Sequence, residues 1–250
     1  MRKFYQTQWH DVKFDDFYQT SINNLAGAEF YDAFYSILFK KYLNYDDLDV
    51  NWRGKKNEIA DWLSSISPEG GRILSIGCGI GYIEQRICSS NDRGLELHVH
   101  DYAPQALFWL KKVLPDDRIH IGGAFSTFNK FDLIYLCAVD YAMKNDELIS
   151  LLSEGRRNLN NNGKLIIISA SFLEEQSVKE SLIYNIKEVM RLILSLLSLR
   201  SMGQFWGWLR SAKEYREAMT EAGFVSVAEG RIESSAQNTY WIEGVNINEH

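Results

Sequence analysis

From residue 72 onward, short apolar runs alternate with segments whose apolar residues recur at three- and four-residue spacing. Five runs have the length and β-branched content of buried strands: RILSI, LELHVH, RIHI, FDLIYLCAV and KLIIISAS. The segments between them predict helices in YIEQRI, PQALFWLKKVL and NDELISLLSEGRRNL. Such alternation is typical of an α/β protein with a parallel, doubly wound sheet.

The pattern changes after the fifth strand. Residues 173–199 predict one long helical stretch, which SMGQFWGWLR interrupts with two glycines and two tryptophans. A capped helix in SAKEYREAMTEAGF then ends at Gly223, and VSVAEGRI and TYWIEGVNI predict two closing strands. We therefore expect an N-terminal helical and aromatic cap over 1–56, a core over 57–172 and 211–250, and a helical lid insertion over 173–210.

Charge and cysteine content limit the partners. The chain has 33 acidic and 27 basic residues, and its basic pairs are scattered, which disfavours a nucleic acid partner. Three cysteines without CxxC spacing indicate neither a metal site nor a disulfide framework, so a reducing cytoplasm fits best. Because no run is long and uncharged enough to cross a bilayer, we expect no stable membrane span.

The first strand of the alternating region is followed by three glycines at alternate positions, Gly77, Gly79 and Gly81. Glycine suits a turn that needs unusual backbone angles and lets a ligand approach the backbone closely. A dinucleotide fingerprint reads GxGxxG, but here Tyr82 stands where the third glycine would be. The next strand ends at Asp101, whose carboxylate can accept hydrogen bonds from a ribose or cap the helix that begins near Pro104.

These residues resemble the class I S-adenosylmethionine-dependent methyltransferases of the small-molecule type. The resemblance covers about residues 57–245 and is most specific in ILSIGCGIG, HDYAP, FDLIYLCAVDY, LNNNGKLIIIS and the closing helix EYREAMTEAGF with its two strands. It implies a Rossmann-like sheet of seven strands whose last strand runs antiparallel, and S-adenosyl-L-methionine as the cofactor.

The resemblance also implies where the cofactor binds. It places the methionine moiety above Gly77, Cys78, Gly79 and Gly81, the ribose on Asp101, and the adenine among Tyr102, Ala124, Phe125 and Cys137. Many relatives carry an aspartate after the third strand that binds the adenine amino group, whereas this chain has Gly123 there. Adenine would then depend on backbone contacts or on Ser126.

In such relatives an N-terminal segment folds over the cofactor, and a Tyr or Arg from it meets the methionine carboxylate. The candidates in this chain are Tyr5, Tyr18 and Arg53, the last because a guanidinium matches a carboxylate in a two-pronged geometry. His10 is a candidate base because its ordinary pKa lies near working pH, although a lone histidine is more often structural.

The segment AVDYAM after the fourth strand lies where acceptors enter in this fold. Methyl transfer is an in-line displacement in which positioning supplies much of the acceleration, but an alcohol acceptor must also lose a proton. Asp140 could orient the acceptor or take that proton, and Tyr141 could hydrogen-bond to it. Alternatively, Asp140 caps the following helix and Tyr141 packs on the lid.

The apolar stretch over 182–199 is compatible with a lid, a homodimer interface or contact with a membrane surface, and we favour a lid over the acceptor pocket. The resemblance implies transfer of a methyl group to an oxygen or nitrogen of a small molecule, such as a sugar or an isoprenoid-type metabolite. Two alternatives stay open, a nicotinamide-dependent oxidoreductase and a non-catalytic protein that binds S-adenosylmethionine.

Overall fold

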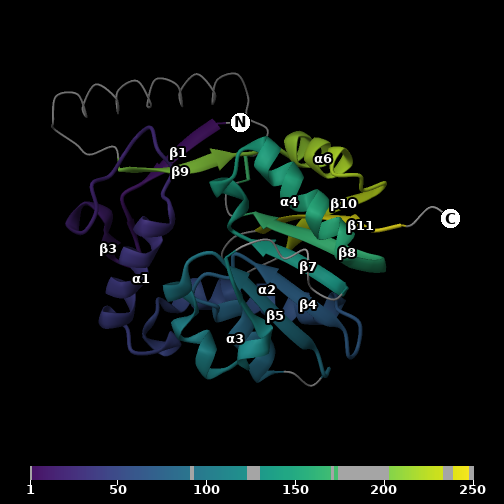
Figure 1. Ribbon diagram of the computed structural model, residues 1–250, viewed down its shortest axis with the longest axis horizontal. Coiled ribbons are helices and arrows are strands. Elements are labelled where there is room, and N and C mark those ends of the chain that lie inside the picture. Colours follow the sequence, from purple (N-terminus) through teal and green to yellow (C-terminus); the bar gives the residue numbers. More distant parts are fainter. Residues whose placement is uncertain are drawn as a thin grey trace.

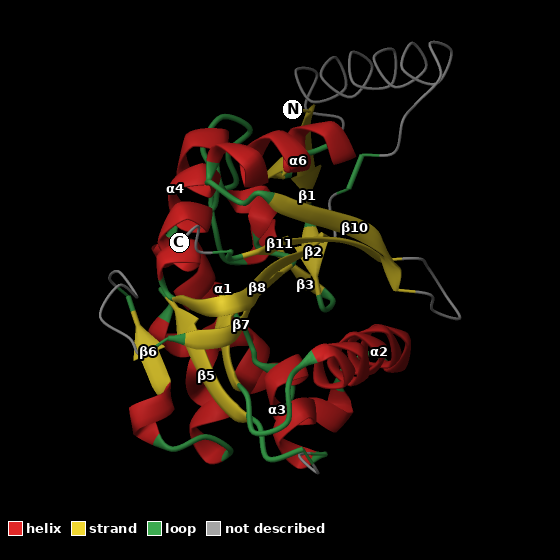
Figure 2. Ribbon diagram, turned by 90° about the vertical axis from the view of Figure 1, so that its right-hand side faces the viewer, coloured by secondary structure: helices red, strands yellow, loops and turns green. Residues whose placement is uncertain are grey.

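The computed structural model describes residues 2–90, 93–122, 130–169, 172–173, 203–232 and 239–247. Its centre is a seven-stranded sheet with the order β10-β11-β8-β7-β4-β5-β6 (Figures 1 and 2). The strands are β4 (Arg72–Ile76), β5 (Glu96–Asp101), β6 (Ile119–Ile121), β7 (Phe131–Cys137), β8 (Leu159–Ser169), β10 (Ser226–Ile232) and β11 (Thr239–Val245). The neighbouring pairs β8–β7, β7–β4, β4–β5 and β5–β6 are parallel. Strand β11 is antiparallel to both β8 and β10, which confirms the predicted fold class.

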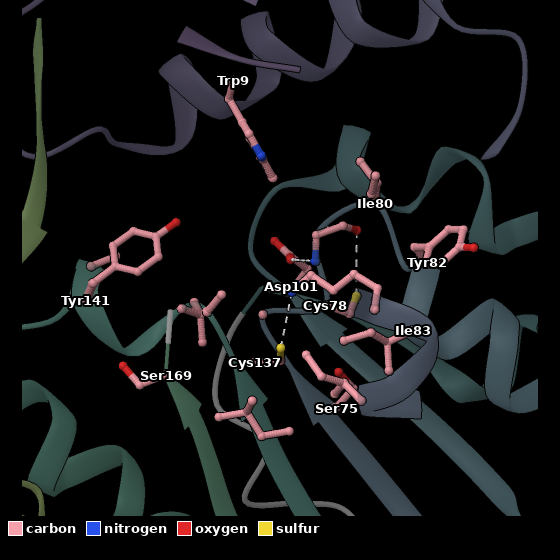
Figure 3. Close-up of a pocket in the computed structure, with 18 of the residues that line it drawn as sticks. Trp9, Ser75, Cys78, Ile80, Tyr82, Ile83, Asp101, Cys137, Tyr141 and Ser169 are labelled. Atoms are coloured by element: carbon pink, nitrogen blue, oxygen red, sulfur yellow. Dashed lines mark hydrogen bonds between the residues drawn. The ribbon is translucent and has the colours of Figure 1, made fainter. Parts of the chain in front are cut away.

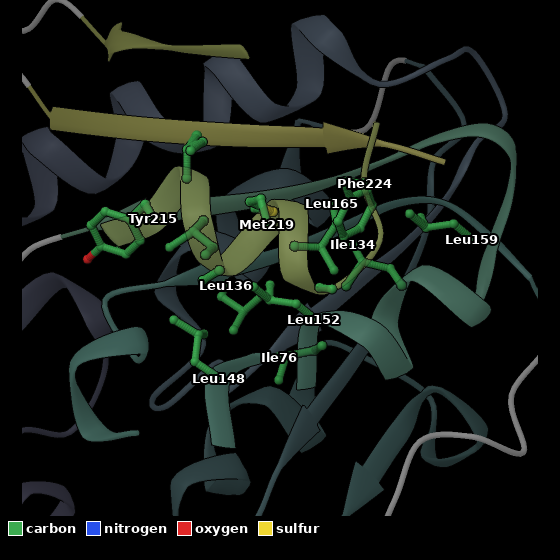
Figure 4. Close-up of a cluster of buried hydrophobic side chains, with 14 of the residues drawn as sticks. Ile76, Ile134, Leu136, Leu148, Leu152, Leu159, Leu165, Tyr215, Met219 and Phe224 are labelled. Atoms are coloured by element: carbon green, nitrogen blue, oxygen red, sulfur yellow. The ribbon is translucent and has the colours of Figure 1, made fainter. Parts of the chain in front are cut away.

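Helices cover both faces of this sheet. Figure 2 shows α4 (Asn145–Arg157) and α6 (Ala212–Glu221) on one face, and α2 (Val50–Ile66) and α3 (Tyr82–Ser89) on the other. Successive side chains of a strand point to opposite faces, so in β4 Ile76 packs toward α4 and α6 (Figure 4). Ile73 of the same strand packs toward α2 and α3. Burial on both faces explains why these strands read as nearly continuous apolar runs.

The predicted helix that ends near Gly223 is confirmed as α6. The Ser211 hydroxyl accepts a hydrogen bond from the Glu214 amide, and the Glu214 carboxylate accepts one from the Ser211 amide, which together form a capping box. Gly223 follows the helix with a φ of 92°, in the left-handed region that ends many helices.

The N-terminal segment differs from the helical expectation. Strand β1 (Arg2–Gln6) pairs antiparallel with β9 (Gln204–Leu209), so QFWGWL is a strand rather than an interruption between helices (Figure 1). Two-residue strands β2 (Gln8–Trp9) and β3 (Val12–Lys13) follow before the helices α1 (Ala28–Lys41) and α2. Strand formation here depends on a partner about 200 residues away along the chain, which local residue spacing does not reveal.

An aromatic cluster joins the β1–β9 ribbon to α1. The Phe14 ring lies 5.0 Å from both the Trp206 and the Phe30 rings, and the Trp9 ring stacks on Phe34 at 5.0 Å. Phe14, Phe30 and Phe34 are fully buried. These contacts fix β9 and the first helix to each other through packing of large apolar rings.

The helix expected in PQALFWLKKVL differs in the structure, and the expected lid is not tested. PQALFWLKKVL forms two short 3-10 helices, η3 (Pro104–Phe108) and η4 (Leu110–Lys112), rather than one α-helix. The lid hypothesis for 182–199 falls outside the described residues. None of the helices in the described ranges is both long and apolar enough to cross a membrane.

A substitution at Gly81 tests how tightly the glycine turn is packed. Its φ is 73°, and an added Cβ would lie 2.1 Å from Cγ of Leu110. We expect Gly81→Ala to lower the free energy of unfolding by about 2–4 kcal/mol, through left-handed strain and overpacking.

Gly54→Ala is the matched control. Gly54 lies inside α2, and an added Cβ would have no heavy atom within 4 Å. Alanine there should raise the free energy of unfolding by about 0.5–1 kcal/mol, because glycine is unfavourable in a helix interior. Urea unfolding measures both, and equal effects of the two substitutions would contradict the packing described here.

Candidate functional site

A cavity of about 800 Å³ lies at the carboxyl ends of four neighbouring parallel strands. Its wall includes Gly77 after β4. It also includes Asp101 of β5, Cys137 of β7 and Ser169 of β8 (Figure 3). In open α/β sheets this edge is where ligands bind, because strand ends and loops leave polar backbone and side chains there. Aromatic residues from the N-terminal part and β9 complete the wall: Phe4, Trp9, Tyr31, Tyr35, Trp52 and Trp206.

The glycine turn follows β4 and forms one side of the cavity. Gly77, Gly79 and Gly81 all have positive φ, between 57° and 73°. A Cβ on Gly77 would lie 2.6 Å from Cγ2 of Val139, so this position also needs glycine for packing. Gly77 and Gly79 line the cavity, whereas Gly81 is the N-cap of α3 and is packed against Leu110 behind the turn.

The Asp101 carboxylate fastens the glycine turn to the end of β5. Its Oδ2 accepts a hydrogen bond from the Gly79 amide at 2.9 Å (Figure 3), and its Oδ1 accepts one from the Ala103 amide at 2.9 Å. Asp101 is not the N-cap of η3, since Ala103 holds that position. Burial raises the pKa of Asp101, while the two amides oppose this shift. A carboxylate has about four lone-pair positions, so both oxygens can still accept bonds from a ligand.

Three other predicted cofactor residues line the same cavity. Cys78 belongs to the glycine turn, Tyr102 follows Asp101 with 44% of its surface exposed, and Cys137 ends β7. The Cys137 Sγ accepts a hydrogen bond from the Lys56 ammonium at 3.4 Å. Ala124 and Phe125 lie outside the described residues.

The residues predicted to bind the methionine carboxylate do not line the cavity. Tyr5 packs on Phe205 in the β1–β9 ribbon, and Tyr18 packs on Phe30 in the aromatic cluster. The Arg53 guanidinium pairs with Asp46 at 3.0 Å and donates to the Leu48 carbonyl. None of the three predicted residues lines the cavity.

His10 also lies outside the cavity wall. Its ring lies 5.0 Å from the Trp9 ring and 4.7 Å from the Trp52 ring. Burial lowers the pKa of His10 to about 4, against the ordinary 6.5. The geometry therefore favours a structural role, because the neutral ring is a weak base with no contact to the cavity.

The two residues after β7 have different environments. Tyr141 lines the cavity and stacks on Trp206 at 6.0 Å, whereas Asp140 is fully buried behind the wall. Asp140 starts the 3-10 helix η6 (Asp140–Ala142), and the N-cap of the next helix is Lys144. The capping alternative for Asp140 is therefore wrong for α4.

Four charged residues of the cavity wall were missed from the sequence, namely Lys55, Lys56, Glu84 and Arg231. Glu84 on α3 is 2% exposed, and its Oε1 accepts hydrogen bonds from the Ser75 hydroxyl and the Tyr135 hydroxyl, both at 2.6 Å. Lys56 on α2 carries an ammonium that faces Cys137 and the ring of Trp52. One sequence signal was available, since Glu84 lies three residues before the apolar Ile87 and therefore on the same face of this short helix.

Glu84 makes stability depend on pH. Burial raises the folded-state pKa of Glu84 above its ordinary value of 4.5, so the ionised carboxylate weakens the fold at high pH. Wild-type protein regains this stability as the pH falls through the folded-state pKa toward the unfolded one. We expect Glu84→Gln to be more stable than wild type at pH 8, and the difference to shrink as the pH falls through the folded-state pKa, so that little of it is left below pH 4.5.

Urea unfolding of both proteins across this pH range measures the difference. Glu154→Gln in α4 is a control substitution of a half-buried glutamate that lies outside the cavity wall. A difference between Glu84→Gln and wild type that stays constant with pH would contradict the assignment.

Comparison with known proteins places this arrangement in a family. A model of the methyltransferase domain matches residues 51–229, which is more than half of the chain. The chain therefore belongs to the methyltransferase-domain family, whose cofactor is S-adenosylmethionine. No curated protein sequence matches the chain.

Solved structures share the fold at low sequence identity. A candidate O-methyltransferase of Nostoc punctiforme aligns over 90% of this chain with 16% identity and a TM-score of 0.59. Human N-acetylserotonin methyltransferase in complex with S-adenosylmethionine aligns over 87% with 20% identity and a TM-score of 0.53. Magnesium protoporphyrin IX methyltransferase of Synechocystis with bound S-adenosylhomocysteine aligns over 87% with 13% identity and a TM-score of 0.57. The chain spans 64%, 56% and 96% of these proteins, respectively.

Proposed function

We propose that this chain transfers the methyl group of S-adenosylmethionine to an oxygen or nitrogen of a small molecule. One observation carries the proposal: the glycine turn and the Asp101 carboxylate meet at one side of a cavity whose other side is aromatic. Sites for small ligands commonly have volumes of about 300–1,000 Å³, and this cavity lies in the upper part of that range. Its size is compatible with a cofactor and an acceptor together.

The charges of the wall suit the amino acid end of the cofactor. The Lys56 ammonium and the Glu84 carboxylate both line the cavity beside the glycine turn. S-adenosylmethionine carries one carboxylate and one ammonium at that end, so the pair offers one partner of opposite sign to each. In this proposal Lys56 takes the role that the sequence suggested for Arg53.

The aromatic side suits a small acceptor. Tyr141, Trp206, Phe172 and Tyr240 line it, and the rings of Phe172 and Tyr240 stack at 3.9 Å. Two of the structural neighbours are named for small-molecule acceptors, N-acetylserotonin and magnesium protoporphyrin IX, which supports the same class here. A sugar or an isoprenoid-type acceptor remains compatible with these walls.

We also propose a cytoplasmic location and no nucleic acid partner. All three cysteines are free thiols, as a reducing compartment allows. The net charge of −6 disfavours binding to a polyanion. A homodimer through 182–199 stays a prediction.

The cofactor assignment predicts selective binding. S-adenosylhomocysteine should bind in the micromolar range and raise the melting temperature, because it binds only the folded protein, whereas NAD should do neither. Asp101→Asn should weaken this binding by about 1.5–3 kcal/mol, since it replaces a charged acceptor of hydrogen bonds with a neutral one. Isothermal titration measures both.

Asp117→Asn, which removes a carboxylate in the 3-10 helix over 116–118, is the matched control and should bind like wild type. Absence of any S-adenosylhomocysteine binding at millimolar concentration would overturn the proposed function. Unchanged binding of S-adenosylhomocysteine to Asp101→Asn would contradict only the proposed role of Asp101 in holding the cofactor.

Lys56 is tested with two ligands. Lys56→Met should weaken S-adenosylhomocysteine binding about tenfold, the loss of one charge-assisted hydrogen bond. Adenosine lacks the amino acid end, so its affinity should stay unchanged. Lys111→Met, on the exposed side of η4, removes the same charge away from the cavity and should affect neither ligand. Equal losses for both ligands in Lys56→Met would contradict this placement.

A further inference from the structure

Three tyrosines lie together on the wall of the cavity, and we call them the tyrosine cluster. Tyr31 and Tyr35 lie one turn apart on α1, and their ring centres are 6.2 Å apart. Tyr141 lies on η6 and makes a hydrogen bond with Tyr31. The cofactor contacts proposed above use none of these three hydroxyls.

The Tyr35 hydroxyl faces the glycine turn. A Cβ added to Gly79 would lie 3.2 Å from this hydroxyl oxygen. Tyr35 is 4% exposed, and its hydroxyl makes no hydrogen bond to another residue in the described part of the chain. A buried polar group without a partner is unfavourable, so a ligand in the cavity is the expected partner of this hydroxyl.

The Tyr141 hydroxyl reaches the cavity from the opposite side. Figure 3 shows the side chain extending from η6 into the cavity, with its hydroxyl pointing toward the space between Trp9 and Asp101. Burial raises the pKa of Tyr141, and hydrogen bonds with Tyr31 and Trp206 oppose this shift. An indole N–H only donates, so the Tyr141 oxygen accepts from Trp206 and its own proton can serve a ligand.

The hydroxyls of the tyrosine cluster stay protonated at neutral pH. Burial is the largest cause of the raised pKa of all three side chains. Loss of the proton would leave a phenolate charge inside an apolar wall, which is unfavourable. Tyr35 and Tyr141 therefore offer hydrogen-bond donors, and they suit a ligand group whose oxygens only accept.

The charged side chains on the described part of the wall favour an anion. Three are cationic and two are anionic, namely Lys55, Lys56, Arg231, Asp101 and Glu84. S-adenosylmethionine adds one net positive charge, because its sulfonium and ammonium outnumber its carboxylate. An anionic acceptor is therefore attracted to the loaded cavity, whereas a protonated amine is repelled.

We propose that the methyl acceptor is a carboxylate group, to which Tyr35 and Tyr141 donate hydrogen bonds. One carboxylate oxygen forms a bond to the methyl carbon while the carbon–sulfur bond breaks, which gives a methyl ester and S-adenosylhomocysteine. The negative charge of the carboxylate and the positive charge of the sulfonium disappear together. No proton moves in this step, and the two tyrosines act by positioning the acceptor.

This proposal rests on the proposed function and narrows it to one class of acceptor. A carboxylate is ionised at neutral pH, whereas an alcohol or an ammonium must lose a proton to attack. The two carboxylates on the described part of the wall, Asp101 and Glu84, already accept hydrogen bonds from the protein. An acceptor that needs no base therefore fits this wall best.

The first experiment measures binding of three probes of similar size to the complex with S-adenosylhomocysteine. Benzoate, benzyl alcohol and benzylamine differ only in the group attached to the ring. Benzoate should bind at least about tenfold more tightly than the other two, because its oxygens accept charge-assisted hydrogen bonds. Equal affinity for benzoate and benzyl alcohol, tighter binding of benzylamine, or no benzoate binding overturns the proposal.

Two variants assign the contact to the tyrosine cluster. Tyr35→Phe and Tyr141→Phe should each weaken benzoate binding about tenfold, the loss of one hydrogen bond to a charged group, and leave benzyl alcohol nearly unchanged. Tyr42→Phe is the matched control, because the Tyr42 hydroxyl donates to the His10 carbonyl and Tyr42 does not line the cavity. Unchanged benzoate binding in either cavity variant overturns the proposal.

The second experiment follows methyl transfer from S-adenosylmethionine to the same three probes. Methyl benzoate should be the main product, and kcat should stay level between about pH 6 and pH 9, because no proton moves. Faster methylation of benzyl alcohol or benzylamine, a kcat that rises with pH, or no methyl benzoate overturns the proposal. If S-adenosylhomocysteine still binds the wild type, only the carboxylate acceptor is rejected, whereas absence of that binding rejects the proposed function itself.

Discussion

Burial of the central sheet on both faces is the constraint on which the rest of the structure depends. With α2 and α3 on one face and α4 and α6 on the other, the middle strands carry apolar side chains in both directions. Polar groups that serve a ligand therefore gather where the strands end. Asp101 and Ser169 are both the last residues of their strands, and the glycine turn begins one residue after β4.

Several charged groups lie inside this apolar setting, and hydrogen bonds hold each one in place. Two hydroxyls hold Glu84, two backbone amides hold Asp101, and Arg210 is fixed by two carbonyls and an asparagine side chain. Burying a charge is unfavourable unless such partners are present. The partners also fix the direction in which each charge faces, which a site for a zwitterionic cofactor requires.

The sequence predicts the parts of the fold that depend on local pattern. Residue spacing predicts the strands of the sheet, and the glycines with Asp101 predict the turn and its neighbour on β5, because adjacent parallel strands end at one edge. Local pattern does not reveal which side chains already bind other groups of the protein and are therefore not available to a ligand. Arg53 fits a carboxylate by chemistry, but Asp46 lies seven residues earlier and pairs with it. Asp140 was a candidate for the acceptor site, yet it is fully buried and does not line the cavity, whereas Ser169 at the end of β8 does.

The β1–β9 ribbon has a consequence for the order in which the molecule assembles. Arg2 pairs with Leu209, so the ribbon closes a loop of about 200 residues. Closing a long loop is entropically unfavourable, and contacts of such long sequence separation form late in folding. Phe4, which lies on β1, thus reaches its place on the cavity wall only after β9 is available to pair with that strand. Until then the part of the cavity wall that Phe4 and Trp206 form is missing.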